Sequence, residues 1–119
     1  MINKLSYHIL RIGLAVTFLW IGFLIFMEPE VWGGFLQPWV VELLPVPVKI
    51  AMLGTAMLDV AVGALLLLNL FTWLAAGIGV LHLVIVLITS GFNSVTIRDI
   101  GLLAASAALS LESWGLRQK

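Results

Sequence analysis

Residues 46–91 decide the fold, and they read VPVKIAMLGTAMLDVAVGALLLLNLFTWLAAGIGVLHLVIVLITSG. The stretch holds two apolar runs, 46–70 and 71–91, each about as long as the roughly 20-residue helix that crosses a bilayer. Only helices and closed barrels satisfy backbone hydrogen bonds inside lipid, and continuous apolar runs favour helices. The two runs meet at residues 69–72 with almost no loop, so the sequence predicts a tight antiparallel helical hairpin.

Two further apolar runs, 8–27 and 97–116, flank this hairpin. Hydrophobic residues make up 62% of the 119-residue chain, charged residues make up 10%, and the mean hydropathy is +1.18. A soluble chain of this size has too much surface to hide so many apolar side chains. The sequence therefore predicts one all-α domain over residues 1–119, an integral membrane four-helix bundle with helices at about 8–27, 46–70, 71–91 and 97–116.

Charge and cysteine content exclude several kinds of function. Six Lys plus Arg balance six Asp plus Glu, with no basic tract for nucleic acid. The chain has no cysteine, which excludes disulfides, thiolate metal sites and cysteine-ligated iron–sulfur clusters within it. The run 8–27 is too long for a typical signal-peptide core, contains Arg11 and is followed by Glu28-Pro29-Glu30, so we expect it to be retained as a helix.

Positive charges indicate the orientation in the membrane, which we expect to be the cytoplasmic membrane of the cell. With the N-terminus inside, the cytoplasmic ends carry more positive charges than the outer ends: Lys4, Arg11, Arg117 and Lys119 against Lys49 and Arg98. Both termini are therefore predicted to be cytoplasmic. In the first outer connection, residues 37–45 begin at Gln37-Pro38 and end at Pro45, which predicts a short helix lying in the outer interface. The alternative is an irregular loop anchored by its tryptophans.

Ionisable residues near the middle of two runs mark the candidate site. Asp59 and His82 fall at similar depth, and Trp20 reaches the same level, where indole is unusual. Intramembrane ionisable residues are costly and are functional by default. We expect Asp59, His82 and Trp20 to form one site that binds the head group of a lipophilic ligand or relays protons. The alternative is an internal hydrogen bond that only fixes the helix register.

No metal site is predicted, because His8 lies about 16 Å from His82 in depth at 1.5 Å per residue.

Two charged pairs lie at the helix ends. Arg11, just inside the first run, and Glu112, near the end of the fourth, share the cytoplasmic side, which predicts a structural ion pair. The alternative is that each side chain reaches water separately. Arg98 and Asp99 form a pair that opens the fourth run, where Asp99 suits the positive end of the helix dipole. A solvated helix cap is the alternative for this second pair.

Three stretches carry a resemblance to a known family. They are Arg11-Ile12-Gly13-Leu14-Ala15 continuing to Phe18-Leu19-Trp20-Ile21-Gly22, then Met57-Leu58-Asp59-Val60-Ala61-Val62-Gly63, then Ile97-Arg98-Asp99-Ile100-Gly101-Leu102-Leu103. In order and spacing they resemble the DoxX family of small four-helix membrane proteins, over most of the chain. Phe26-Met27 departs from the Lys-Phe of many relatives, so any role of that lysine is absent here. The family is named after a subunit of a thiosulfate:quinone oxidoreductase, so the resemblance implies a redox-linked or quinone-associated subunit.

These observations lead to one preferred function and two alternatives. The preferred one is a redox-associated membrane subunit that binds a quinone or similar lipophilic molecule between its helices, with electrons supplied by a partner redox protein and no covalent cofactor. Asp59 and His82 would hydrogen-bond the oxygens of the ligand, and Trp20 would stack on it or donate to Asp59. A small proton-coupled transporter built around Asp59 is the second reading, and a purely structural assembly subunit is the third. The sequence leaves open whether the chain is an enzyme and which oligomer it forms.

Overall fold

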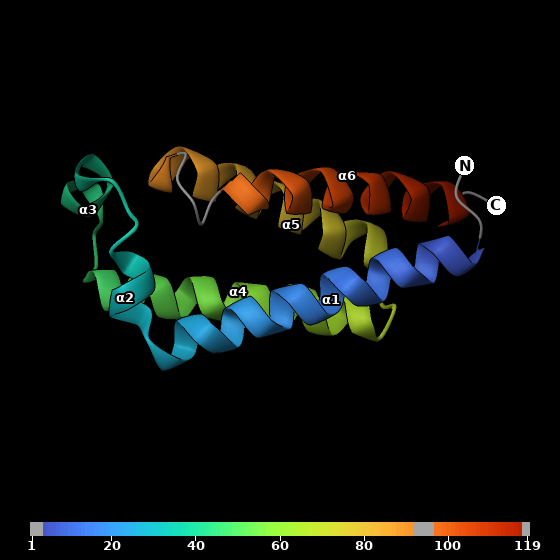
Figure 1. Cartoon of the computed structure of the whole chain (residues 1–119), viewed down its shortest axis with the longest axis horizontal. Coiled ribbons are helices and arrows are strands. Elements are labelled where there is room, and N and C mark those ends of the chain that lie inside the picture. Colours follow the sequence, from blue (N-terminus) through green and yellow to red (C-terminus); the bar gives the residue numbers. More distant parts are fainter. Residues whose placement is uncertain (1–3, 92–96, 118–119) are drawn as a thin grey trace.

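The structure, a computed structural model, describes residues 4–91 and 97–117, and every regular element in these ranges is a helix (Figure 1). The elements are α1 (Lys4–Met27), α2 (Pro29–Gly33), α3 (Pro38–Leu43), α4 (Val48–Leu67), α5 (Thr72–Ser90) and α6 (Ile97–Arg117). The four long helices begin and end within a few residues of the predicted runs. Both short helices begin at a proline, which suits the first turn because proline lacks an N–H and its φ is already helical.

The connection between α4 and α5 is as tight as predicted. Asn69 and Phe71 both adopt left-handed backbone angles, with φ values of 55° and 48°, which reverse the chain within a few residues. Asn is one of the few side chains that tolerate this region. The Oδ1 atom of Asn69 accepts a hydrogen bond from the hydroxyl of Thr72 at 2.7 Å, which fixes the first turn of α5.

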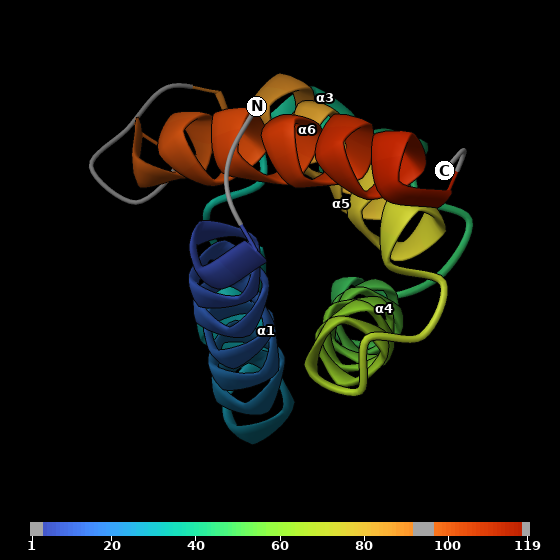
Figure 2. The same cartoon turned by 90° about the vertical axis from the view of Figure 1, so that its right-hand side faces the viewer.

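The long helices are arranged as two pairs. α1 packs most extensively against α4, and α5 packs most extensively against α6, while contacts between the pairs are fewer. Seen along the long axis, α6 runs obliquely over the layer that α1 and α4 form (Figure 2). α4 and α5 are neighbours in sequence but pack less extensively on each other than α4 packs on α1, because α4 turns its small residues toward α1.

Glycines allow α1 and α4 to approach closely. A Cβ atom built on Gly63 would lie 2.7 Å from Cγ of Leu19 and 3.0 Å from the backbone oxygen of Ala15. A Cβ atom built on Gly22 would lie 3.0 Å from the backbone oxygen of Ala56. Small residues at helix interfaces are the usual means of close packing in membranes, where lipid removes the hydrophobic drive between helices.

Three of the described helices, α1, α4 and α5, are long and apolar enough to cross a membrane. α6 has comparable length but is not among them, because it is richer in alanine and serine and carries charges at both ends. Three of the four predicted spans are thus candidate membrane-spanning helices, and the membrane-spanning four-helix bundle stays a prediction. The molecule is 46 Å long, close to the roughly 40–45 Å of a bilayer with its head groups. α1 begins and α6 ends at the same end of this axis (Figure 1).

The connection between α1 and α4 is mostly ordered into helix. The predicted short helix over residues 37–45 is present as α3, and α2 precedes it, where no helix was expected. Gln37 attaches the connection to the end of α5: its backbone N–H donates to the carbonyl oxygen of Thr89 at 2.9 Å, and its side-chain amide donates to that of Ile88 at 3.0 Å. That α3 lies in a membrane interface stays a prediction.

Candidate ligand-binding site

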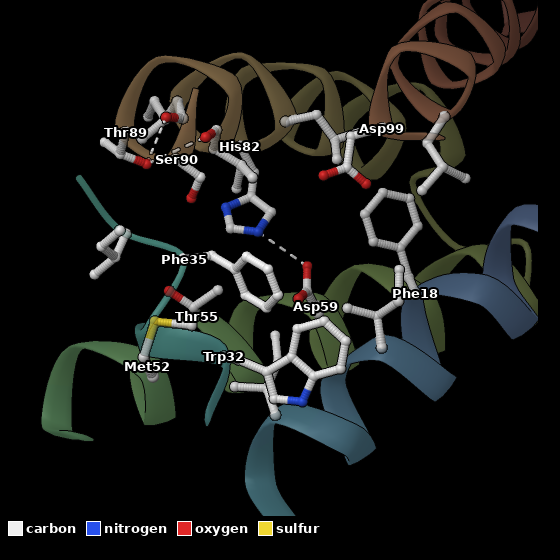
Figure 3. Close-up of a pocket in the computed structure, with 17 residues that line it drawn as sticks. Phe18, Trp32, Phe35, Met52, Thr55, Asp59, His82, Thr89, Ser90 and Asp99 are labelled. Atoms are coloured by element: carbon white, nitrogen blue, oxygen red, sulfur yellow. Dashed lines mark hydrogen bonds and ion pairs between the residues drawn. The ribbon is translucent and has the colours of Figure 1, made fainter. Parts of the chain in front are cut away.

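A cavity of about 170 Å³ lies where the two helix pairs meet and extends toward the end of the molecule that α2 forms (Figure 3). Its walls come from α1, α2, α4, α5, α6 and the segment after α2. The lining is mainly aromatic and aliphatic, and includes Phe18, Ile21, Ile25, Trp32, Phe35, Leu36, Met52, Leu83, Ile85, Val86 and Leu102. The polar lining residues are Thr55, Asp59, His82, Thr89, Ser90 and Asp99.

Asp59 and His82 form a buried pair in the cavity wall. Nε2 of His82 on α5 lies 3.0 Å from Oδ1 of Asp59 on α4, and the two residues are 9% and 3% exposed. A carboxylate oxygen only accepts, so Nε2 carries the proton of this hydrogen bond. The structure brings the two residues together inside the protein, as the sequence predicts, and their role in binding a ligand stays a prediction.

Helical periodicity explains why both side chains point inward. On α4, Asp59 follows the fully buried Ala56 and precedes the buried Val62 and Gly63. On α5, His82 lies one turn after the buried Gly79 and beside Leu83. Residues three and four apart share one face of a helix, so each ionisable group lies on the face that packs against other helices.

Trp20 does not belong to this site, contrary to the prediction. Its side chain is 63% exposed and does not line the cavity. The physical reason is rotation about the helix axis: the inward face of α1 carries Leu14, Phe18, Gly22 and Ile25, and Trp20 lies two residues, about 200°, beyond Phe18. Equal depth therefore did not mean a shared face. Phe18 supplies the aromatic wall of α1, and the indole in the cavity is that of Trp32 from α2.

Asp99 is a third ionisable residue in the cavity, and the sequence reading missed this role. The alternative of a solvated helix cap is wrong for Asp99, which is 7% exposed and lines the same cavity as Asp59 and His82 (Figure 3). The side chain of Arg98 lies outside the described residues. Asp99 stands in the first turn of α6, where the positive end of the helix dipole favours a negative charge. Its spacing from Ser106 and Ser113, also buried, is the sequence signal that could have identified an inward face.

The predicted ion pair between Arg11 and Glu112 is also wrong. Both side chains are among the described residues, and no ion pair joins them; Glu112 is half-buried on α6. Instead, Nη1 of Arg11 donates to the backbone oxygens of Leu66 and Leu67, at 2.6 and 2.8 Å. The last carbonyls of a helix have no partner within it, and a cation there also suits the dipole.

The rest of the Arg11 guanidinium is held within α1. Nε and Nη2 approach Nδ1 of His8 at 3.2 and 3.1 Å, so this nitrogen acts as an acceptor. Arg11 therefore caps the end of α4 and fixes it to α1. Its role is structural and lies at the opposite end of the molecule from the α2 end of the cavity (Figure 1).

Comparisons of the chain with models of protein families, with curated proteins and with solved structures give no significant match. The resemblance to the DoxX family thus rests on its three stretches alone. The cavity itself offers one kind of chemistry: it surrounds a small apolar body with hydrocarbon and presents a few polar groups at fixed positions, as small-molecule sites generally do. No group of three or more His, Cys, Asp or Glu side chains in the described part of the chain is placed to hold a metal ion.

Proposed function

We propose that this chain is an integral membrane protein that binds a lipophilic ring compound of the quinone class in the cavity beside Asp59 and His82. The observation that supports this most directly is a buried Asp–His pair in the wall of an otherwise apolar cavity, between helices long enough to cross a membrane. Burying two ionisable groups costs free energy that an apolar pair would not cost. Such groups inside membrane helices generally serve substrates, ligands or protons.

The size of the cavity supports a ligand with one six-membered ring. Its volume of about 170 Å³ is similar to the roughly 150 Å³ of an engineered apolar cavity that accepts benzene. The rings of Phe18, Trp32 and Phe35 surround it, and aromatic rings prefer offset or edge-to-face packing on one another (Figure 3). Phe35 and Ile85 are partly exposed at its margin, which provides an exit for a hydrocarbon tail toward lipid.

The membrane arrangement in this proposal has four crossings with both termini in the cytoplasm. α6 runs antiparallel to α5 over a similar length, so it reaches the same two ends of the molecule (Figure 1). The excess of positive charge at the end where α1 begins supports the cytoplasmic assignment. α3 then lies at the outer surface, beside the α2 end of the cavity.

The place of this binding protein in metabolism is proposed from the DoxX resemblance. It is a redox-associated subunit that presents a quinone-class molecule to a partner redox protein, which supplies or accepts the electrons. Asp59 and His82 hydrogen-bond the ring oxygens and hold the ring in one orientation. The chain contributes binding and position, and the electron chemistry belongs to the ligand and the partner.

A second candidate, a proton-coupled transporter of lipophilic cations, is favoured by one observation. Asp99 adds a second carboxyl group to a cavity with three aromatic walls, and a cation is attracted both to carboxylates and to aromatic faces. Vesicle experiments separate the two: a transporter moves protons together with a cationic substrate, whereas a binding subunit leaves the proton gradient unchanged.

A thermal-shift titration with a short-chain quinone and its hydroquinone tests the proposed function. A ligand at 100 times its dissociation constant stabilises the folded protein by about 2.7 kcal/mol. We expect the melting temperature of the wild type to rise with at least one of the two compounds, and the rise to shrink in Asp59→Asn and in His82→Leu. Glu112→Gln is the matched control, since it removes a charge on α6 away from the cavity. Equal shifts in all four proteins would rule the site out.

A further inference from the structure

We infer that the cavity prefers a ring compound bearing hydroxyl groups, such as a hydroquinone or another phenol, over the corresponding carbonyl compound. This inference rests on the proposed function and specifies the form of the ligand. It follows from the hydrogen-bonding capacity of the polar groups in the wall. Asp59 and Asp99 can accept a hydrogen bond from a ligand, and so can His82 and two threonines, whose own protons are donated to protein oxygens.

A neutral His82 presents an acceptor to the cavity. Its Nε2–H is donated to Oδ1 of Asp59 at 3.0 Å, and a neutral imidazole with a proton on Nε2 has a lone pair on Nδ1. Within the described residues, Nδ1 of His82 makes no hydrogen bond. Oδ2 of Asp59 is a further acceptor beside it. The two residues together therefore offer lone pairs rather than protons.

The two threonines in the wall have also donated their protons. The hydroxyl of Thr55 donates to the backbone oxygen of Ala51 at 3.2 Å. The hydroxyl of Thr89 donates to the backbone oxygen of Ile85 at 2.9 Å. A threonine bonded in this way to its own helix keeps its oxygen lone pairs but has no second proton to give.

Asp99 adds a second carboxyl group to the wall from α6. It stands in the first turn of α6, and a carboxylate only accepts hydrogen bonds. A carboxylate has two oxygens with about four lone-pair sites, so a partner elsewhere leaves it able to accept from a ligand as well. Trp32 is the aromatic lining residue with a proton to donate, and Figure 3 shows its indole nitrogen on the far side of the ring from Asp59.

This set of acceptors discriminates between two forms of the same ring. A hydroquinone donates from each hydroxyl, so it pairs with the carboxylates and with Nδ1 of His82. A quinone has only carbonyl oxygens, which would face the lone pairs of the wall without a proton between them. A site built to hydrogen-bond a hydroxyl discriminates strongly against the analogue that lacks it, because its own buried polar groups are then left unpaired.

The test is a binding measurement on the full chain in lipid nanodiscs with three compounds that differ only at the ring oxygens. They are a decyl-substituted hydroquinone, its quinone and its bis-methyl ether, titrated anaerobically so that each keeps its oxidation state. We expect the hydroquinone to bind at least about tenfold more tightly than the quinone, and the ether to bind no better than the quinone. Asp99→Asn adds an amide donor and should narrow the preference, while Glu112→Gln should leave it unchanged.

Each outcome of this experiment is decisive. A quinone that binds as tightly as the hydroquinone, with both weakened by Asp59→Asn, would overturn the inference and leave the proposed function standing. It would show that Nδ1 of His82 or an aspartate carries a proton toward the ligand. Failure of all three compounds to bind would overturn the proposed function and this inference together. The comparison of ligands on the wild type decides the question even where the Asp99 variant does not fold.

Discussion

Nε2 of His82 lies 3.0 Å from Oδ1 of Asp59, and this contact joins the helix pair α1–α4 to the helix pair α5–α6. The two pairs contact each other less extensively than the helices within each pair do, and the cavity lies in this sparser region. The Asp–His hydrogen bond therefore both links the pairs and forms one wall of the cavity. A ligand bound there contacts both pairs at once.

Because α1 and α4 cross closely, we expect one methyl group added at Gly63 to lower the stability of the protein substantially. Gly63→Ala would place Cβ 2.7 Å from Cγ of Leu19 and 2.9 Å from its backbone nitrogen, so the helices must separate. We expect a loss of about 1–3 kcal/mol of stability, the usual cost of overpacking. Gly54→Ala is the matched control on the same helix: no atom lies within 4 Å of its added Cβ, so it should be neutral or slightly stabilising. Chemical denaturation in detergent micelles measures the free energy of unfolding of both variants. Equal changes in the two would contradict a close approach of α1 and α4 at Gly63.

Because Arg11 caps α4, we expect its removal to cost much more stability than the removal of the charge on Glu112. Arg11→Met removes the donors to the Leu66 and Leu67 carbonyls, and we expect a loss of about 1.5–3 kcal/mol, the range for hydrogen bonds to charged groups. Glu112→Gln should change stability by less than about 0.5 kcal/mol, because the two side chains form no ion pair. Unfolding measurements on the two single variants and the double variant check this. A coupling energy of 1 kcal/mol or more between the two substitutions would indicate that Arg11 and Glu112 do form an ion pair.

The positions of the tryptophans predict whose fluorescence a bound ligand quenches. A bound quinone-class ring quenches the fluorescence of an indole in contact with it, and Trp32 lines the cavity whereas Trp20 is exposed on α1. Trp32→Phe should remove most of the ligand-dependent quenching, and Trp20→Phe should preserve it. Fluorescence titration of the two variants separates the positions. Loss of quenching in the Trp20 variant alone would place the ligand on the outer face of α1.

Topology is tested by reporter fusions at the N-terminus, at Glu30 and at the C-terminus. Four crossings place both termini in the cytoplasm and Glu30 outside. The measurement is the activity of a reporter that folds only on one side of the membrane. A C-terminal reporter on the side opposite to the N-terminal one would mean that α6 does not cross.

The sequence was sufficient to predict the long helices because apolar runs separated by polar turns leave little freedom in lipid. It also placed Asp59 and His82 together, since a short turn near Asn69 brings two helices to the same depth and their periodicity turns both residues inward. Depth alone failed for Trp20, where the rotation of α1 decides which side chains face the core. The buried set of Leu14, Phe18 and Gly22 shows that rotation.

The remaining features depend on how helices pack, which a single sequence does not show. The guanidinium of Arg11 binds backbone carbonyls of α4, and any residue type can supply a carbonyl, so no partner could be identified from side chains. The sequence predicts that Asp99 belongs to a charged pair at a helix end, with a solvated cap as the alternative, whereas the structure buries Asp99 in the wall of the cavity. Helix ends are polar in most proteins, so this burial follows from tertiary placement and not from local sequence.

Photolabelling tests the central claim most directly, because it reports where a ligand binds. A photoreactive short-chain hydroquinone is cross-linked to the protein in nanodiscs, and the modified residues are identified by mass spectrometry. The account predicts labels on lining residues such as Trp32, Phe35 and Met52, reduced by unlabelled hydroquinone and by Asp59→Asn. Labels confined to the exposed face of α1, at Trp20 and Phe23, and insensitive to competitor, would contradict a ligand site in the cavity.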